Sequence, residues 1–361
     1  MKRVLVVVDS FGLPSSHSAA LQYADLFRAN GYDARFVARD QPEGFVQRDR
    51  VANWAWRLGR RNRSRSMKAD ILRRWDDRIV EMARECDVAY LVKIPSVDLH
   101  ERIVSLAAPR LLVLFADAFW LPWARQRGWQ GLERVLSVAH GVLTVNEFTA
   151  AHARAWNPRV FIMNDSPQTE DFDLVRDSVR RDPERVTLGW IGSPATATSL
   201  FRIWDPLEVL FEKYGNLHLR LVGTGSDSLI NVPRFEKVRW SAREHYDHDS
   251  MIDEVLRMDI GLFPMFRGED ARARGALKAC VYMSGEAAVV AQRYDEVTEI
   301  IDDRVNGMLA GSDEEWIEKL ADLVEHPEER RAIAAHGLAT VRERFSRART
   351  FDQLRHAIES V

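Results

Sequence analysis

The sequence predicts an α/β protein made of two Rossmann-like domains, each with a parallel sheet. The chain of 361 residues exceeds the size of one ordinary hydrophobic core and suits two. Short apolar runs of strand length alternate with helical segments in both halves. A polar stretch separates these halves, so we place the first domain at residues 1–165, a linker at 166–184 and the second domain at 185–345.

The first half opens with Val4–Val8, an uninterrupted apolar run that predicts a buried strand. A helix is expected from Ser15, a capping residue, to the stop signal at Gly31, and a second strand follows at Ala34–Ala38. This strand–helix–strand order is typical of a parallel sheet. Further strands are predicted at Val88–Val92, Leu111–Phe115, Val142–Val145 and Val160–Met163.

The second half repeats the pattern. Strands are predicted at Thr187–Ile191, Leu217–Val222, Lys237–Trp240, Ile260–Phe263 and Ala288–Ala291. Helices are predicted at Ser199–Tyr214 and Gly275–Ser284. A ligand is expected at the carboxyl ends of these strands, where open α/β sheets bind nucleotides.

Composition points to a cytoplasmic protein. Apolar residues make up 46% of the chain and charged residues 29%, and no apolar run approaches the ~18 residues of a membrane-spanning helix. The run after Met1 is too short for a signal peptide. Cys86 and Cys280 lie in apolar segments without the spacing of metal ligands, and a reducing compartment is their simplest interpretation.

A basic segment at residues 48–74 carries ten Lys or Arg residues against two Asp residues, although the whole chain has a net charge of −3. It has two interpretations: a solvated surface helix, or a surface that binds an anionic acceptor or the inner face of a membrane. Nucleic acid is not expected as a partner, because the positive charge is confined to this one segment.

The most informative stretch begins at Asp259–Met265, where a predicted buried strand opens into a loop. The loop is followed by two cations, Arg274 and Lys278, at the start of a predicted helix. Spaced four residues apart, they are expected to share one helix face. A helix amino terminus already favours an anion, so this arrangement outlines a site for a nucleoside diphosphate.

These residues and several neighbouring motifs resemble the donor-binding half of family 4 (group 1) glycosyltransferases, which have the two-domain GT-B fold. The resemblance is strong after about Thr187 and weak before it. The segments that carry it are Leu188–Pro194, Asp259–Met265, Arg274–Gly285, Ala288–Ala291, Glu299–Ile301 and Asp303–Leu309.

The resemblance implies a retaining, metal-independent transferase without a cofactor, in which two Rossmann-like domains face each other across a cleft and bind a nucleotide-sugar donor and an acceptor. It also implies that the last helix, residues 346–361, packs back on the first domain. Glycines and small residues after strands would let the backbone approach the donor. The residues expected at the donor are Gly12, Gly192, Ser193, Gly223, Arg274, Leu277 and Lys278.

Two residues of the first half are expected on the acceptor side. Asp117 keeps the last acid of an acidic run that the family carries after a strand, and it would orient the acceptor or take its proton. Its alternative role is to cap the next helix. His17 follows the first strand, where the family places a loop at the cleft; its alternative is an exposed residue in the first helical turn.

The chain also departs from the family. Many members carry two glutamates at the positions of Ala273 and Val281, and Glu269 or Asp270 would have to substitute. This loss leaves two alternatives open. One is a catalytically silent GT-B binding or scaffold subunit, and the other is a different GT-B enzyme such as a nucleotide-sugar epimerase.

Overall fold

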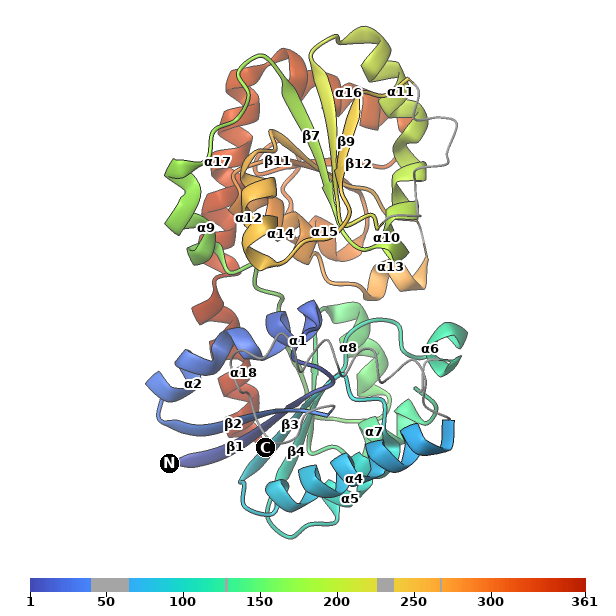
Figure 1. The fold of residues 1–361 in the computed structure, drawn as a ribbon, viewed down its shortest axis with the longest axis vertical. Coiled ribbons are helices and arrows are strands. Elements are labelled where there is room, and N and C mark those ends of the chain that lie inside the picture. The colour runs from blue at the N-terminus through green and yellow to red at the C-terminus, as the bar shows by residue number, and fades with distance from the viewer. Residues whose placement is uncertain (40–64, 127–128, 226–236, 267) are drawn as a thin grey trace. The chain divides into compact units, whose positions relative to one another are not determined.

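The computed structural model describes residues 1–39, 65–126, 129–225, 237–266 and 268–361, and these fall into two compact units (Figure 1). Unit 1 contains Met1–Asn164 and Thr350–Val361, and unit 2 contains Asp165–Arg349. Each unit holds a six-stranded parallel sheet with helices around it, which confirms the predicted α/β fold.

In unit 1 the strand order is β2-β1-β3-β4-β5-β6. All six strands arise where the sequence predicts them. The central strands β1, β3, β4 and β5 are mostly buried apolar runs, whereas the edge strands β2 and β6 are only partly buried. The strands are β1 (Lys2–Val8), β2 (Tyr32–Ala38), β3 (Val88–Val92), β4 (Arg110–Leu114), β5 (Gly141–Thr144) and β6 (Val160–Ile162). The helices are α1 (Pro14–Ala19), α2 (Ala24–Ala29), α4 (Arg65–Ala83), α5 (Val97–Val104), α6 (Pro122–Gln126), α7 (Leu132–Val138) and α8 (Glu147–Arg154).

The single helix predicted after Ser15 is wrong, since a 3₁₀ turn, η1 (Leu21–Tyr23), separates α1 from α2. The break follows from tertiary packing: Tyr23 is fully buried, and its hydroxyl bonds that of Thr350 at 2.9 Å. Thr350 lies on the last helix, α18 (Arg347–Ser360), whose residues from 350 onward belong to unit 1.

In unit 2 the strand order is β12-β11-β10-β7-β8-β9. The strands are β7 (Val186–Ile191), β8 (Leu217–Val222), β9 (Trp240–Arg243), β10 (Ile260–Phe263), β11 (Ala288–Gln292) and β12 (Met308–Ala310). The helices are α9 (Thr169–Val175), α10 (Pro194–Ala197), α11 (Trp204–Lys213), α12 (His248–Leu256), α13 (Glu269–Ala273), α14 (Leu277–Ser284), α15 (Asp295–Ile300), α16 (Asp313–Glu325) and α17 (Pro327–Arg344). Two 3₁₀ segments, η2 (Arg176–Ser178) and η3 (Thr198–Ile203), complete the unit.

Unit 2 differs from the sequence analysis in four places. The strand expected at Lys237–Trp240 is shifted, because β9 is an edge strand with exposed residues and its ladder begins only at Trp240. The helix predicted from Ser199 is divided into η3 and α11. The sequence also missed β12, which has only three residues. Residues 166–184, expected as a linker, belong to unit 2, where buried Phe172 of α9 packs in a core cluster.

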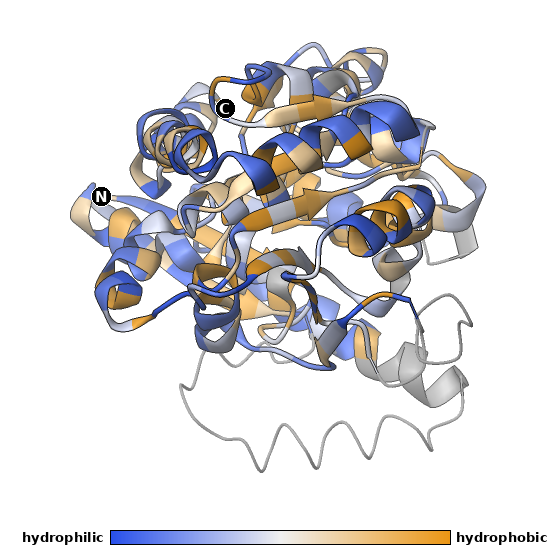
Figure 2. Cartoon of the chain, turned by 90° about the horizontal axis from the view of Figure 1, so that it is seen from above, coloured by the Kyte–Doolittle hydropathy of each residue, from blue (hydrophilic) through white to orange (hydrophobic). Residues whose placement is uncertain are grey.

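Hydrophobic side chains fill the layers on both faces of each sheet. The strands are mostly apolar, whereas the helices carry polar residues on their outer sides (Figure 2). In unit 2, Leu188 and Trp190 of β7 belong to one core cluster and Ile191 to the other, as the alternation of side chains along a strand requires. This double coverage fixes the strand ends at which the predicted site residues lie.

Candidate functional site

Lys278 lies in the first turn of α14, at the carboxyl edge of the sheet of unit 2. Its Nζ atom lies 4.8 Å from the ring centroid of Trp190 and donates a hydrogen bond of 3.2 Å to the hydroxyl of Thr196. Burial lowers the pKa of Lys278 to about 7, and the nearby positive charge of Arg274 adds to this effect. Among the described groups, no carboxylate contributes to this pKa.

Burial away from a carboxylate makes this ammonium costly to keep charged, and the ring of Trp190 offsets only part of that cost. The start of α14 adds to the positive potential, because no described side chain caps it and the N–H groups of Leu277 and Lys278 lie in its first turn. This part of the molecule therefore favours a bound anion.

Arg274 does not share a helix face with Lys278, contrary to the sequence prediction. It follows the end of α13 with extended backbone angles, φ −82° and ψ 142°, and so lies outside α14. Its guanidinium bonds the carboxylate of Asp270 through two nitrogens, at 2.6 and 3.0 Å. An anion at α14 would have to compete with Asp270 for this cation.

The turn after β7 precedes Thr196, the residue whose hydroxyl accepts the hydrogen bond from Lys278. Gly192 and Ser193 connect β7 to α10, and the hydroxyl of Thr196 accepts a hydrogen bond of 3.1 Å from the N–H of Ser193. A Cβ atom on Gly192 would lie 2.5 Å from the Trp190 ring and 2.7 Å from the Thr196 hydroxyl. Gly192 is thus required by the two side chains that hold Lys278.

Gly223, after β8, packs against the same turn. It has φ +86°, and a Cβ atom on it would lie 2.1 Å from the carbonyl oxygen of Gly192. The structure therefore brings the predicted residues Gly192, Ser193, Gly223 and Lys278 together at adjacent strand ends, with Leu277 beside them.

The other predicted residues lie in unit 1. Gly12 lies in the turn after β1 and His17 in α1, and both follow a strand that pairs with β3. Asp117 comes three residues after the end of β4. Its carboxylate does not cap a helix, which corrects that alternative; it accepts a hydrogen bond of 2.9 Å from the Nζ of Lys93.

Lys93 is a residue that the sequence reasoning missed. Both partners of the Lys93–Asp117 pair have left-handed backbone angles, φ 54° and 81°. Such a conformation costs a non-glycine residue about 1–2 kcal/mol, whereas a half-exposed ion pair returns about 0–1 kcal/mol. The pair therefore does not stabilise the fold. The one feature of the sequence that could have indicated Lys93 is its position directly after a buried strand.

The positions of the two missing glutamates are occupied by buried apolar side chains. Ala273 is fully buried, and Val281 belongs to a core cluster of unit 2. In the described part of the chain, no three His, Cys, Asp or Glu side chains gather in a way that would hold a metal ion. No described helix is long and apolar enough to cross a membrane.

Most of the basic segment, residues 48–74, lies outside the described part of the chain. Residues 40–64 lie outside the described part, and the side chains of residues 65–71 are likewise not described. The predicted anionic or membrane partner of residues 48–74 therefore stays a prediction.

Comparisons with known proteins agree with this architecture. Residues 203–356 match the family described as "Glycosyl transferase-like". The chain is also similar to the solved structure of a glycosyltransferase from Rickettsia africae ESF-5, with a TM-score of 0.70 and 14% identity over 99% of this chain and 98% of that one. No match was found among curated protein sequences.

Two further solved structures have the same architecture. A sucrose-phosphate synthase from Thermosynechococcus elongatus gives a TM-score of 0.68 and 10% identity over 99% of this chain and 98% of that one. Anabaena Alr3699/HepE in complex with UDP-glucose gives a TM-score of 0.66 and 15% identity over the full length of both chains. At these identities the similarity concerns the fold, and the two-sheet fold of this chain is the GT-B fold of glycosyltransferases.

Proposed function

We propose that the protein is a retaining glycosyltransferase that moves a sugar from a nucleoside-diphosphate donor to an acceptor hydroxyl without a metal ion. The observation that carries this proposal is Lys278, a half-buried ammonium without a carboxylate partner among the described residues, placed at the uncapped start of α14. Strongly perturbed groups of this kind concentrate at functional sites. The donor diphosphate supplies the missing negative charge.

In this reaction the acceptor oxygen forms a bond to the anomeric carbon as the bond from that carbon to the diphosphate oxygen breaks. The bonding electrons leave with the nucleoside diphosphate, and the acceptor hydroxyl gives its proton to the carboxylate of Asp117. Lys278 stabilises the charge that develops on the leaving group, and Arg274 joins it on release from Asp270. Leu277 supplies a backbone N–H group. Gly192 and Ser193 let the backbone approach the donor, while their own N–H groups bond the carbonyl of Val222 and the hydroxyl of Thr196.

In this proposal Gly12 contacts the donor, and Asp117 and His17 act on the acceptor. The match of residues 203–356 to a glycosyl transferase-like family supports a transferase. The neighbour from Anabaena, solved with UDP-glucose, supports UDP-glucose as the first donor to test. Retention, metal independence and membership of family 4 rest on the sequence motifs from Leu188 to Leu309.

The test combines binding with product analysis. We expect UDP, GDP or ADP to raise the thermal stability of the protein, since a ligand that binds only the folded state stabilises it. Incubation with the matching nucleotide sugar and a set of acceptors, with and without EDTA, should yield a new glycoside of unchanged anomeric configuration. The absence of stabilisation by all three nucleotides would contradict the proposal.

A catalytically silent GT-B subunit is the second candidate. It is favoured by the buried apolar residues Ala273 and Val281, at positions where many family members carry glutamates. Such a protein binds the nucleotide but consumes no nucleotide sugar. An epimerase would consume the sugar without forming a glycosidic bond, so the same product analysis separates the three.

Lys278 also makes nucleotide binding depend on pH. In the free protein its ammonium loses a proton as the pH rises through about 7. A bound diphosphate raises the pKa of Lys278 again, because a neighbouring opposite charge favours the charged form. We therefore expect about half of the full affinity at pH 7, proton uptake on binding at pH 8, and an affinity that falls by up to about tenfold per pH unit towards pH 9.

Calorimetry with UDP at pH 7, 8 and 9, in buffers of different ionisation enthalpy, measures this proton uptake. Over this range the terminal phosphate of the nucleotide has lost its second proton, since that group has a pKa of about 6. Lys278→Arg is the matched control, because a guanidinium stays charged throughout and binding should then take up no proton. Equal proton uptake by the wild type and Lys278→Arg would rule out Lys278 as the source.

A further inference from the structure

A second polar centre lies at the carboxyl edge of the sheet of unit 1. Lys93 comes directly after β3, and Asp117 follows the neighbouring strand β4. The ends of these strands are paired, Val92 with Leu114. The Nζ of Lys93 and the Oδ2 of Asp117 are 2.9 Å apart, and the two side chains are 24% and 34% exposed. The pair is therefore fixed in position yet open to solvent on one side.

The backbone around this pair is strained at both ends. Five described non-glycine residues have a positive φ, and two of them, Lys93 and Asp117, are joined by a hydrogen bond between their side chains. An unfavourable conformation persists only where the surroundings impose it, and such residues concentrate at ligand sites. The main chain adds to this constraint, since the carbonyl of Asp117 accepts a hydrogen bond of 2.9 Å from the N–H of Phe119.

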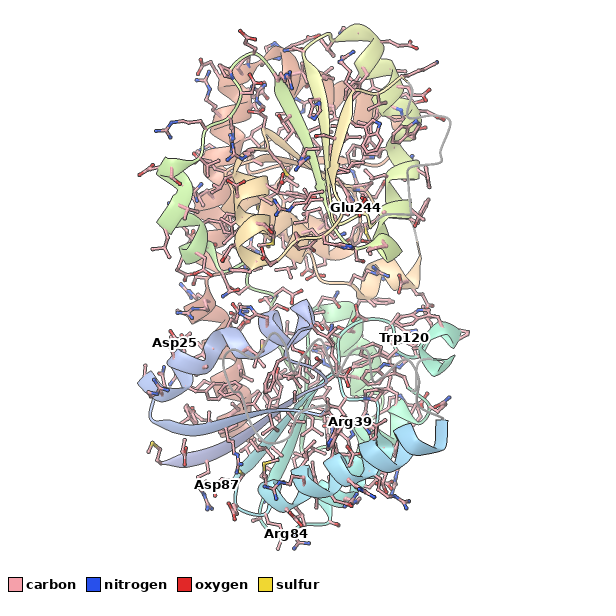
Figure 3. The ribbon with its side chains drawn as sticks, in the orientation of Figure 1. Asp25, Arg39, Arg84, Asp87, Trp120 and Glu244 are labelled. Carbon is pink, nitrogen blue, oxygen red and sulfur yellow. The ribbon has the colours of Figure 1, made fainter. Side chains whose placement is uncertain are left out.

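A rigid aromatic surface continues from this turn. Trp120, in the loop between β4 and α6 (Figure 3), is partly exposed. Its ring lies parallel to that of His152 of α8, with centroids 4.1 Å apart and an interplanar angle of 14°. Phe115 and Phe148 lie 5.9 and 5.8 Å from it, so three rings hold the indole in one orientation.

We propose that Lys93, Asp117 and Trp120 bind the acceptor, and that the acceptor presents a sugar ring. A carboxylate accepts hydrogen bonds from two neighbouring hydroxyls, and an ammonium donates to a hydroxyl oxygen. One face of the Trp120 indole is stacked on His152, and the proposal places the apolar C–H face of a pyranose against the part of the ring that is exposed. The inference rests on the proposed function, because the acceptor is the second substrate of that transfer.

The charges favour a sugar over an anionic headgroup. A phosphate would meet Lys93 but also the carboxylate of Asp117, 2.9 Å from the lysine nitrogen. A hydroxylated ring uses both members of the pair, because hydroxyls both donate and accept. A sugar acceptor therefore makes use of the whole arrangement, whereas a phosphate makes use of half of it.

The test uses the full chain saturated with UDP and saturation-transfer NMR of four probes: methyl α-D-glucopyranoside, methyl α-D-mannopyranoside, methyl β-D-galactopyranoside and N-acetylglucosamine. Glycerol 3-phosphate is the anionic comparison. We expect signal transfer to the ring C–H protons of at least one pyranoside. This transfer should fall at least fivefold in Lys93→Met and Asp117→Asn, and also in Trp120→Leu.

Asp87→Asn is the matched control. Asp87 also forms an ion pair in unit 1, with Arg3 at 3.1 Å, but it lies just before β3, at the opposite end of the sheet from Trp120 (Figure 3). This variant should contact the pyranoside like the wild type. UDP affinity measured by calorimetry should be unchanged in all four variants, and thermal unfolding at the wild-type temperature shows that unit 1 is folded in each.

The proposal is overturned if no pyranoside contacts the wild type, or if contact survives in both Lys93→Met and Asp117→Asn. Preferred binding of glycerol 3-phosphate that depends on Lys93 would overturn it in favour of an anionic acceptor. Failure here differs from failure of the proposed function. If UDP binds through Lys278 but no pyranoside is contacted, only the acceptor inference fails.

Discussion

Lys278→Ala is expected to weaken the binding of a nucleoside diphosphate by about 10- to 100-fold while leaving the fold intact. The substitution removes the charge-assisted hydrogen bond that we propose between Lys278 and the diphosphate, an interaction worth about 1.5–3 kcal/mol. It does not break an ion pair in the free protein, because no described carboxylate partners the ammonium. The variant should therefore unfold at the same temperature as the wild type or a higher one.

Calorimetry with UDP near pH 7, beside thermal unfolding without ligand, measures both effects. Lys237→Ala is the matched control, because it removes the same charge from an exposed lysine of unit 2 that pairs with Glu212 at 3.5 Å. This control should keep its nucleotide affinity. An equal loss of affinity in the two variants would show that unit 2 attracts the nucleotide by its general charge, and Lys278 would lose its assigned role.

Much of the fold could be predicted from the sequence, because the central strands of both sheets are buried on both faces and appear as continuous apolar runs. The failures occur where tertiary contacts decide. The strand β12 is too short to form a pattern, and the first predicted helix is divided where Tyr23 bonds Thr350. The local sequence therefore predicts neither the strand β12 nor the break in the first helix.

The candidate site was predicted in part. Lys278 and the glycines were found because a strand, a turn and a helix start place such residues at one sheet edge. The shared face of Arg274 and Lys278 was wrong, since the chain is extended between α13 and α14. There a Cβ atom on Gly275 would lie 2.0 Å from the carboxylate of Asp165, a contact between residues far apart in the sequence.

Lys93 shows a different limit of the sequence. No motif surrounds it, and a lysine after a strand is ordinarily a solvated residue. Its role is apparent only from its left-handed backbone and its bond to Asp117, both of which depend on the pairing of β3 with β4. A single sequence shows neither feature.

Gly223→Ala is expected to produce the largest loss of stability among single glycine substitutions at the donor site. Two costs add. The residue has φ +86°, which costs alanine about 1–2 kcal/mol. The new Cβ atom would also lie 2.1 Å from the carbonyl oxygen of Gly192, and relief of such crowding costs about 1–3 kcal/mol more. A destabilisation of about 2–5 kcal/mol follows.

Two other glycines separate these costs. Gly31 has φ +77° but nothing within 4 Å of its Cβ position, so Gly31→Ala should show the backbone cost alone. Gly215 has open space and no positive φ, so Gly215→Ala should be neutral or stabilise slightly through the unfolded chain. Urea unfolding of the three variants measures the series. The order Gly223→Ala, Gly31→Ala, Gly215→Ala, from most to least destabilised, is expected.

The same substitution connects stability to binding. Relief of the contact at Gly223 must move the turn that holds Gly192 and Ser193, and with it Thr196, the hydroxyl to which Lys278 donates. We therefore expect Gly223→Ala to weaken UDP binding at temperatures where it is still fully folded, while Gly31→Ala, in unit 1, leaves the affinity unchanged. If Gly223→Ala is destabilised but binds UDP normally, the turn after β8 serves the fold and not the donor. Normal stability of this variant would show that the close approach to Gly192 is not present in solution.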